Sequence, residues 1–310
     1  MNPHPLDRAV AFLSRRSRLF SRGWGDESIL SEFSDRNRYL ARPSLISIEW
    51  SQRRRMGART VRDGKFLSPL AELPPPVATA FVRSWTREGN ETACVMPAAS
   101  RDEGYRIRER TFLPLLESGA DLYFLENPYY GQRRNGRGPS DVSVADQGLM
   151  ALGMVLECRA VLEHVRPRYR KLAVAGYSMG GHMAALTAAV VPFPVACAAL
   201  ATGASASAIY TRGLLSWSVD FATLGSEART RLKKLFDVAD LTNFRPPIRV
   251  DAAVVSGCTR DGYVLADETE RLHRHWKAST LRWIDAGHFS ALFTQGQALR
   301  DCVAAAIAKL

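Results

Sequence analysis

No stretch of this sequence approaches the roughly 18 uninterrupted apolar residues that a membrane-spanning helix needs. The first apolar stretch, residues 9–13, runs directly into two arginines, so it does not resemble the hydrophobic segment of a secretory leader. We therefore expect a protein that is cytoplasmic or at most peripheral to a membrane.

Cysteine is scarce as well, with five residues that are scattered along the chain and never spaced as C-x-x-C. The odd number and the irregular spacing argue against a disulfide framework and against a zinc site. Four of the five lie in apolar surroundings, which is typical of buried, reduced thiols. The cysteines therefore give no reason to expect a zinc site.

Lysine is rare, so the formal net charge of +11 comes almost wholly from arginine. Such an excess can attract lipid headgroups, phosphorylated substrates or nucleic acid. No zinc-finger spacing, recognition-helix pattern or RNA-binding aromatic signature accompanies the charge, so we expect no nucleic-acid partner. An arginine-rich but ordinary solvated surface is the simpler interpretation of the overall charge.

Residues 1–40 show no strand pattern. Leu6, Val10, Leu13 and Phe20 fall roughly on one helical face, and Arg8, Arg15, Arg18 and Arg22 lie off that face. This basic, amphipathic extension could lie on an anionic membrane surface or act as a targeting presequence. It could equally be a helix packed on the following domain, which is the interpretation we favour.

From residue 41 to residue 310 the pattern is that of strands alternating with helices. Such alternation predicts an α/β fold, with a mostly parallel central sheet and helices on both faces. Between about residues 204 and 247 the alternation stops, and we expect a small cap insertion there. Strands are predicted at 44–50, 60–67, 92–97, 121–126, 171–177, 195–201, 249–256 and 281–284, and helices at 77–85, 104–118, 140–164, 180–190, 227–238, 264–276 and 289–310.

The motif Gly176-Tyr177-Ser178-Met179-Gly180 follows the apolar strand residues 171–175 and precedes a helix. A G-x-S-x-G motif in this setting is typical of a nucleophile elbow, where the serine sits on a sharp strand-to-helix turn. Ser178 is then the candidate nucleophile, and the Met179 N–H is placed to donate to an oxyanion.

A serine hydroxyl needs a base, and the base needs an acid that orients it. In chain order, Asp261 follows the strand 249–256 and His288 follows the strand 281–284. Both positions lie at the carboxyl ends of their strands, where open α/β sheets bind ligands. Asp285 remains an alternative acid, although its closeness to His288 in sequence makes it a poor orienting group. His182 is a weaker base candidate, because it lies one turn after Ser178 on the same helix.

Two further loops are expected at the same edge of the sheet. The loop after the strand 92–97 consists of small residues, so the amide of Ala98 or Ala99 is the candidate for the second oxyanion donor. The loop after the strand 121–126 carries Tyr129, Tyr130 and Arg133. These could bind an acyl chain and an anionic group, or they could simply cover the sheet.

Three segments resemble the α/β-hydrolase domain-containing protein 18-like family of the α/β-hydrolase superfamily. They are Leu-Glu-Asn-Pro-Tyr-Tyr-Gly at 125–131, Ser-Met-Gly-Gly-His-Met-Ala at 178–184 and Gly-His-Phe-Ser-Ala-Leu-Phe at 287–293. The resemblance implies an α/β-hydrolase fold and a serine hydrolase with Ser178, Asp261 and His288 as its triad. It also implies a lipid-directed, mitochondrial protein if the source is eukaryotic. Where the family tends to Leu-Ala-Gly-Thr-Gly-Asp, this chain has Pro-Ala-Ala-Ser-Arg-Asp at 97–102.

Two functions are therefore open. The first is a serine esterase or lipase-like enzyme that cleaves the acyl esters of small molecules or lipids, with no cofactor. The second is a non-catalytic member of the same fold that binds a ligand in its pocket, or an anionic membrane through the basic N-terminus.

Overall fold

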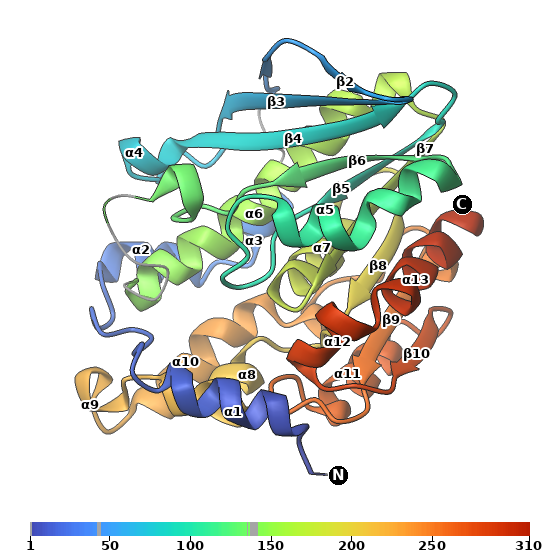
Figure 1. The fold of residues 1–310 in the computed structure, drawn as a ribbon. Coiled ribbons are helices and arrows are strands. Elements are labelled where there is room, and N and C mark those ends of the chain that lie inside the picture. The colour runs from blue at the N-terminus through green and yellow to red at the C-terminus, as the bar shows by residue number, and fades with distance from the viewer. Residues whose placement is uncertain (1, 42–44, 135, 137–141) are drawn as a thin grey trace.

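A computed structural model describes residues 2–41, 45–134, 136 and 142–310. Its centre is a sheet of ten strands in the order β1-β3-β4-β6-β5-β7-β8-β9-β10, with β2 paired to β3 (Figure 1). The strands are β1 (Glu49–Trp50), β2 (Arg54–Met56), β3 (Arg59–Leu67), β4 (Thr79–Arg87), β5 (Thr92–Met96), β6 (Ala120–Leu125), β7 (Lys171–Tyr177), β8 (Ala196–Leu200), β9 (Ala253–Cys258) and β10 (Thr280–Ile284).

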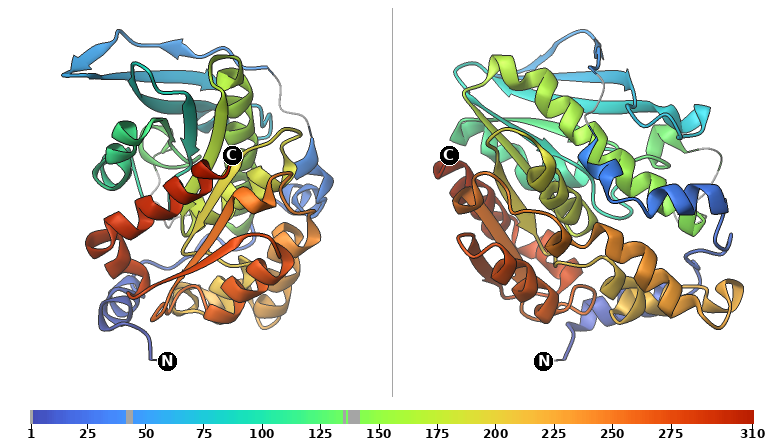
Figure 2. Two further views of the ribbon diagram at one scale, coloured as in Figure 1. Left: turned by 90° about the vertical axis from the view of Figure 1, so that its right-hand side faces the viewer. Right: turned by 180° about the vertical axis from the view of Figure 1, so that it is seen from behind.

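Helices lie on both faces of this sheet (Figure 2). The α-helices are α1 (Pro5–Ser14), α2 (Glu27–Phe33), α3 (Asn37–Leu40), α4 (Pro75–Ala78), α5 (Arg106–Phe112), α6 (Val144–Val165), α7 (Met179–Val190), α8 (Ser207–Thr211), α9 (Phe221–Leu224), α10 (Ala228–Phe236), α11 (Ala266–His275), α12 (His288–Thr294) and α13 (Gly296–Ala308). Short 3-10 turns are η1 (Leu113–Ser118), η2 (Gly131–Arg133), η3 (Arg166–Arg168), η4 (Leu214–Ser218), η5 (Asp237–Ala239), η6 (Leu241–Asn243) and η7 (Val250–Ala252). No helix in the described ranges is both long and apolar enough to cross a bilayer.

The predicted α/β fold is confirmed. All pairings from β6 through β5, β7, β8 and β9 to β10 are parallel, while β1, β2, β3 and β4 join through antiparallel pairings. Every residue of β5, β6, β8 and β9 is buried, as expected of strands with helices above and below them. The elbow sequence thus follows β7, a strand in the middle of the sheet.

The prediction of a helical piece up to residue 85 was wrong. After the short α4, residues 79–87 form β4, which pairs antiparallel with β3 and with β6. Ala80, Val82 and Ser84 are buried while their neighbours Phe81 and Arg83 are only half-buried. This period of two was a signal for a strand.

Other bounds differ less. The first predicted strand is reduced to Glu49–Trp50, and its proposed start at residue 44 lies outside the described residues, as do residues 140 and 141 of the helix predicted at 140–164. The single closing helix is divided into α12 and α13 at Gln295. Pro114 lies at the start of η1, where the helix predicted at 104–118 changes to a 3-10 turn.

The N-terminal segment is part of the main core rather than a separate extension. Phe20 is 0% exposed and packs on Tyr210 and Phe236 of the insertion, with ring centroids 5.4 and 6.2 Å away. Leu30 and Phe33 of α2 belong to the same apolar cluster as β5 and α6. Residues 19–33 therefore pack on the domain, whereas Leu6 and Leu13 of the predicted apolar helical face are 39% and 72% exposed. The neighbours of α1 are η4 and α12, and Figure 1 shows α1 next to α12.

Candidate active site

Ser178 occupies a strained turn between β7 and α7. Its backbone lies at φ 55° and ψ −121°, a region that non-glycine residues rarely adopt. A Cβ at Gly176 would come within 2.3 Å of the Gly180 carbonyl oxygen, and a Cβ at Gly180 within 2.6 Å of the Pro97 carbonyl oxygen. Both glycines are therefore required by the close approach of neighbouring backbone, as a nucleophile elbow demands.

The serine, the histidine and the aspartate selected from sequence lie together at this turn. His288 Nε2 is 2.8 Å from Ser178 Oγ, and His288 Nδ1 is 2.7 Å from Asp261 Oδ2. With Nδ1 protonated toward the carboxylate, Nε2 is free to accept the serine hydroxyl proton. Ser178 itself is half-buried.

Asp261 is fixed by its own loop. Its Oδ1 accepts hydrogen bonds from the backbone N–H groups of Tyr263 (2.8 Å) and Val264 (2.9 Å), which leaves Oδ2 for the imidazole. The alternative acid, Asp285, is exposed and accepts a hydrogen bond from Thr259 Oγ1 at 2.9 Å. Asp261 is thus the carboxylate that orients His288.

His182 is unsuited to act as the base. It is buried, and its two ring nitrogens face the carbonyl oxygens of Gly203 (3.1 Å) and Ala239 (3.0 Å). Burial lowers the pKa of this imidazole. Its position ties α7 to the loop after β8 and to the insertion, which is a structural role.

The electrostatic environment of His288 favours the imidazolium. Burial opposes the charged form, but the charge and hydrogen bond of Asp261, together with the charge of Asp7, outweigh that effect and raise the pKa of His288. An imidazolium stabilised in this way is what a general base becomes after it takes a proton.

The loop after β5 approaches the elbow, but its two alanines differ. The Ala98 N–H donates to Asn127 Oδ1 at 3.1 Å, and the Ala98 carbonyl accepts from Asn127 Nδ2 at 3.0 Å. Because that amide is already engaged, it is a poor candidate for an oxyanion donor. Ala99 is half-buried at the next position, and Met179 begins α7 directly after the serine.

The interpretation of Tyr129, Tyr130 and Arg133 as substrate-binding residues needs correction. Arg133 is 0% exposed and pairs through both terminal nitrogens with Glu157, at 2.8 and 2.7 Å. Its remaining hydrogen bonds go to the carbonyl oxygens of Val77 (2.9 Å) and Glu126 (3.0 Å). These contacts satisfy the guanidinium inside the core, because a buried charge must be paired.

The two tyrosines are also buried, 4% and 2% exposed. The Tyr130 hydroxyl accepts a hydrogen bond from the Arg101 N–H at 3.2 Å, so it fixes the loop after β5. Tyr129 has φ 66° and belongs to the main apolar cluster. This is the covering role that the sequence had left open.

Three further residues contact the site in ways that the sequence does not predict. Asn127 lies in the Asn-Pro-Tyr-Tyr-Gly segment, but nothing in the sequence shows that its amide reaches Ala98. Tyr177 donates from its hydroxyl to the His288 carbonyl at 2.5 Å. Asp7, in α1, accepts a hydrogen bond from the His288 N–H at 2.7 Å. These contacts link residues 29, 111 and 281 positions apart, so no local pattern announces them.

A small cavity of about 140 Å³ lies beside these residues. It is bounded by Ala99 of the loop after β5, by Gly176 and Tyr177 at the end of β7, and by Phe289 and Leu292 of α12. Most of the accessible surface of its lining is apolar. Within the described ranges, no group of three His, Cys, Asp or Glu side chains could ligate a metal.

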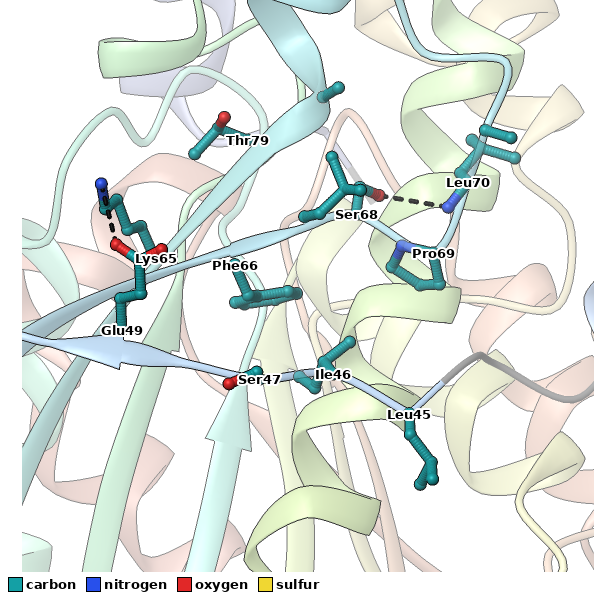
Figure 3. Close-up of a pocket in the computed structure, with 13 residues that line it drawn as sticks. Leu45, Ile46, Ser47, Glu49, Lys65, Phe66, Ser68, Pro69, Leu70 and Thr79 are labelled. Carbon is teal, nitrogen blue, oxygen red and sulfur yellow. Dashed lines mark hydrogen bonds and ion pairs between the residues drawn. The ribbon is translucent and has the colours of Figure 1, made fainter.

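A second hollow, of about 770 Å³, lies at the end of β3 (Figure 3). Phe66, Ile46 and Leu70 line it, and an ion pair of 3.0 Å joins Lys65 and Glu49 at one side. In the strand order, β3 is four places from β7, or about 19 Å at the usual spacing between strands. This hollow is therefore separate from the site at Ser178.

Comparison with known proteins agrees with the α/β fold. Residues 17–234 and 225–309 match the sequence profile of the family described as alpha/beta hydrolase domain containing 18. An acetyl xylan esterase from Paenibacillus sp. R4 superposes with a TM-score of 0.60 at 14% identity, over 92% of this chain and 98% of that chain. The Pyrococcus furiosus esterase Pf2001 gives 0.52 at 16% identity, over 87% and 99%. At such low identity these two structures establish the fold alone.

Proposed function

The chain belongs to the alpha/beta hydrolase domain containing 18 family, and from that premise we propose that it is a serine hydrolase that cleaves carboxylic acyl esters. The observation that carries the proposal is the continuous hydrogen-bonded path from Ser178 Oγ through His288 to Asp261, with distances of 2.8 and 2.7 Å. Nucleophile, base and orienting acid in hydrogen-bond reach are the requirement for an activated serine.

In the proposed reaction, His288 Nε2 takes the hydroxyl proton as Ser178 Oγ attacks the ester carbonyl carbon. The tetrahedral oxyanion accepts hydrogen bonds from the Met179 N–H and from the Ala99 N–H. Ala99 is chosen over Ala98 because the Ala98 N–H already donates to Asn127. His288 then returns the proton to the leaving alcohol, and the acyl group stays on Ser178. Water, deprotonated by the same imidazole, attacks the acyl-enzyme and releases the acid.

We assign the acyl side of the substrate to the cavity of about 140 Å³ whose lining includes Gly176 and Tyr177, the two residues before Ser178. Phe289 and Leu292 give it apolar walls, and Ala99 places the oxyanion loop on its border. Apolar surface of this kind favours a hydrocarbon chain over a charged group. The proposed substrate is therefore an ester with an apolar acyl chain, and a lipid ester belongs to that class.

The exposed face of α1 supports the proposal that the protein binds its substrate at a lipid surface. Phe12 and Leu13 are 63% and 72% exposed, and Arg8 and Arg16 are exposed beside them. The Arg15 guanidinium lies 4.5 Å from the ring centre of Trp217, which is exposed too. Aromatic and aliphatic groups among arginines are typical of a surface that binds anionic membranes.

A fluorophosphonate probe tests the proposed chemistry, because it reacts covalently with an activated serine. The wild-type protein should be labelled, and Ser178→Ala should not be. Ser226→Ala, which removes an exposed serine of the insertion, is the control and should be labelled like the wild type. A folded wild-type protein that stays unlabelled would overturn the proposal and favour a non-catalytic, ligand-binding role.

A further inference from the structure

Asp7, in the first turn of α1, has a carboxylate that is 0% exposed and lies directly behind His288. Its Oδ2 accepts hydrogen bonds from the backbone N–H groups of His288 (2.7 Å) and Gly262 (3.3 Å). Its Oδ1 accepts one from the Phe289 N–H at 3.0 Å. One carboxylate thus joins the loop that carries Asp261 to the segment that carries the histidine.

The chain around Asp7 is fitted to the same place. The His4 N–H donates to the Arg260 carbonyl at 2.9 Å, which adds a second contact to the loop after β9. A Cβ at Gly287 would approach His4 Cβ to 2.3 Å and Asp7 Oδ1 to 2.9 Å. Glycine at 287 therefore allows α1 to lie against the histidine segment, and Figure 1 shows α1 and α12 side by side.

The backbone of His288 is consequently fixed on both sides. Asp7 accepts from its N–H, while the Tyr177 hydroxyl donates to its carbonyl oxygen at 2.5 Å. Tyr177 immediately precedes Ser178, so its hydrogen bond to the His288 carbonyl fixes the histidine relative to the elbow. The hydrogen bond from the His288 N–H to Asp7 fixes the histidine relative to α1 and to the loop that carries Asp261. Rigid support of this kind decides whether an imidazole stays in line with its nucleophile.

We propose that Asp7 is a positioning residue of the active site: it fixes the His288 segment to the Asp261 loop and adds a second negative charge next to the imidazole. The inference rests on the proposed function, because it assigns Asp7 a part in the same reaction. It also explains why a charged side chain of the N-terminal segment is buried, since three backbone N–H groups compensate its charge.

The charge has a measurable consequence. Burial has the largest effect on the pKa of His288 and lowers it. The charge and hydrogen bond of Asp261 raise this pKa, and the charge of Asp7 raises it further by a smaller amount. Removal of the Asp7 charge should therefore lower the pKa of the base. The titratable or hydroxyl groups that face His288 are Asp261 and Tyr263 from the loop after β9, Tyr177 from β7, Ser178 from the elbow and Asp7 from α1.

The experiment compares the full chain with Asp7→Asn, Asp7→Ser and Asp7→Glu. The rate of fluorophosphonate labelling and kcat/KM for a chromogenic acyl ester are measured against pH, with thermal unfolding as a check on folding. Asp220→Asn is the matched control: Asp220 is 7% exposed, and its partners are the Thr223 N–H and Arg18, the latter at 3.1 Å, rather than Ser178, Asp261 or His288. If the Asn variant does not fold, the Ser variant, which also removes the charge, takes its place.

Asp7→Asn and Asp7→Ser should lower the plateau of kcat/KM by about 10- to 100-fold, the size expected when a catalytic group is displaced. They should also move the acid limb to lower pH, whereas Asp7→Glu and Asp220→Asn should keep the wild-type limb. A limb that stays at the wild-type pH in the Asn and Ser variants overturns the inference, whether or not the plateau falls. A wild-type chain that is not labelled at all refutes the proposed function instead, so the two failures are distinguishable.

Discussion

Asp261 Oδ2 lies 2.7 Å from His288 Nδ1, although 27 residues separate the two in sequence. Asp285 is only three positions from the histidine, yet its carboxylate accepts from Thr259 Oγ1 on the neighbouring loop. The two aspartates follow adjacent parallel strands, β9 and β10. The loop conformation after β9, and not nearness in sequence, selects the carboxylate that orients the ring.

Asp261→Asn should therefore reduce kcat for an acyl ester by about 10⁴-fold, because an amide stabilises the wrong tautomer of the histidine. Asp285→Asn should leave kcat near the wild-type value. Steady-state kinetics on both variants, with circular dichroism to verify folding, provide the measurement. Equal losses in the two variants would contradict the assignment of the acid.

The pH dependence of the wild-type protein should reveal the raised pKa of His288. The base works only when it is neutral, so kcat/KM should increase as the pH rises through the pKa of the free protein. Because that pKa is raised, the midpoint of the acid limb should lie above the ordinary value of about 6.5. A profile of kcat/KM between pH 5 and pH 9 tests this, and a midpoint clearly below 6.5 would exclude the proposed electrostatics.

Arg133→Met should destabilise the fold rather than alter substrate choice. The change leaves Glu157 as an uncompensated buried carboxylate, which typically costs about 3–5 kcal/mol. Arg134→Ala removes a half-exposed pair with Glu103 and should change stability by no more than about 0.5 kcal/mol. Urea unfolding gives both values. If Arg133→Met is as stable as the wild type but loses activity toward anionic esters, a binding role must be restored.

Membrane contact through α1 can be tested without deleting residues 1–40, because Phe20 and Leu30 of that segment are part of the core. The double variant Phe12→Ser/Leu13→Ser should float less with anionic liposomes, because it removes the two most exposed apolar side chains of α1. Leu67→Ser, on β3 and 73% exposed, is the control and should float like the wild type. Flotation that persists in the double variant would refute α1 as the contact surface.

The order of the elements and the three residues at the elbow could be anticipated from local patterns. Apolar strands that alternate with helices predict a parallel sheet, and the carboxyl ends of such strands meet at one edge. Ser178, Asp261 and His288 each follow a strand, so topology alone brings them near one another. The segment that follows the prolines at 74–76 was predicted as a short helix up to residue 85, whereas its period of two belongs to β4.

By itself, then, the sequence determined the α/β architecture, the family and the candidates for nucleophile, base and acid, because these depend on short-range periodicity and on motifs. Only the tertiary structure decided between Asp261 and Asp285. It also showed that Arg133 is paired inside the core and that Asp7 contacts the His288 backbone. Each of those outcomes depends on where a side chain meets backbone or charge that is far away in sequence. Burial and long-range hydrogen bonds, which no local pattern encodes, are the physical reason for the difference.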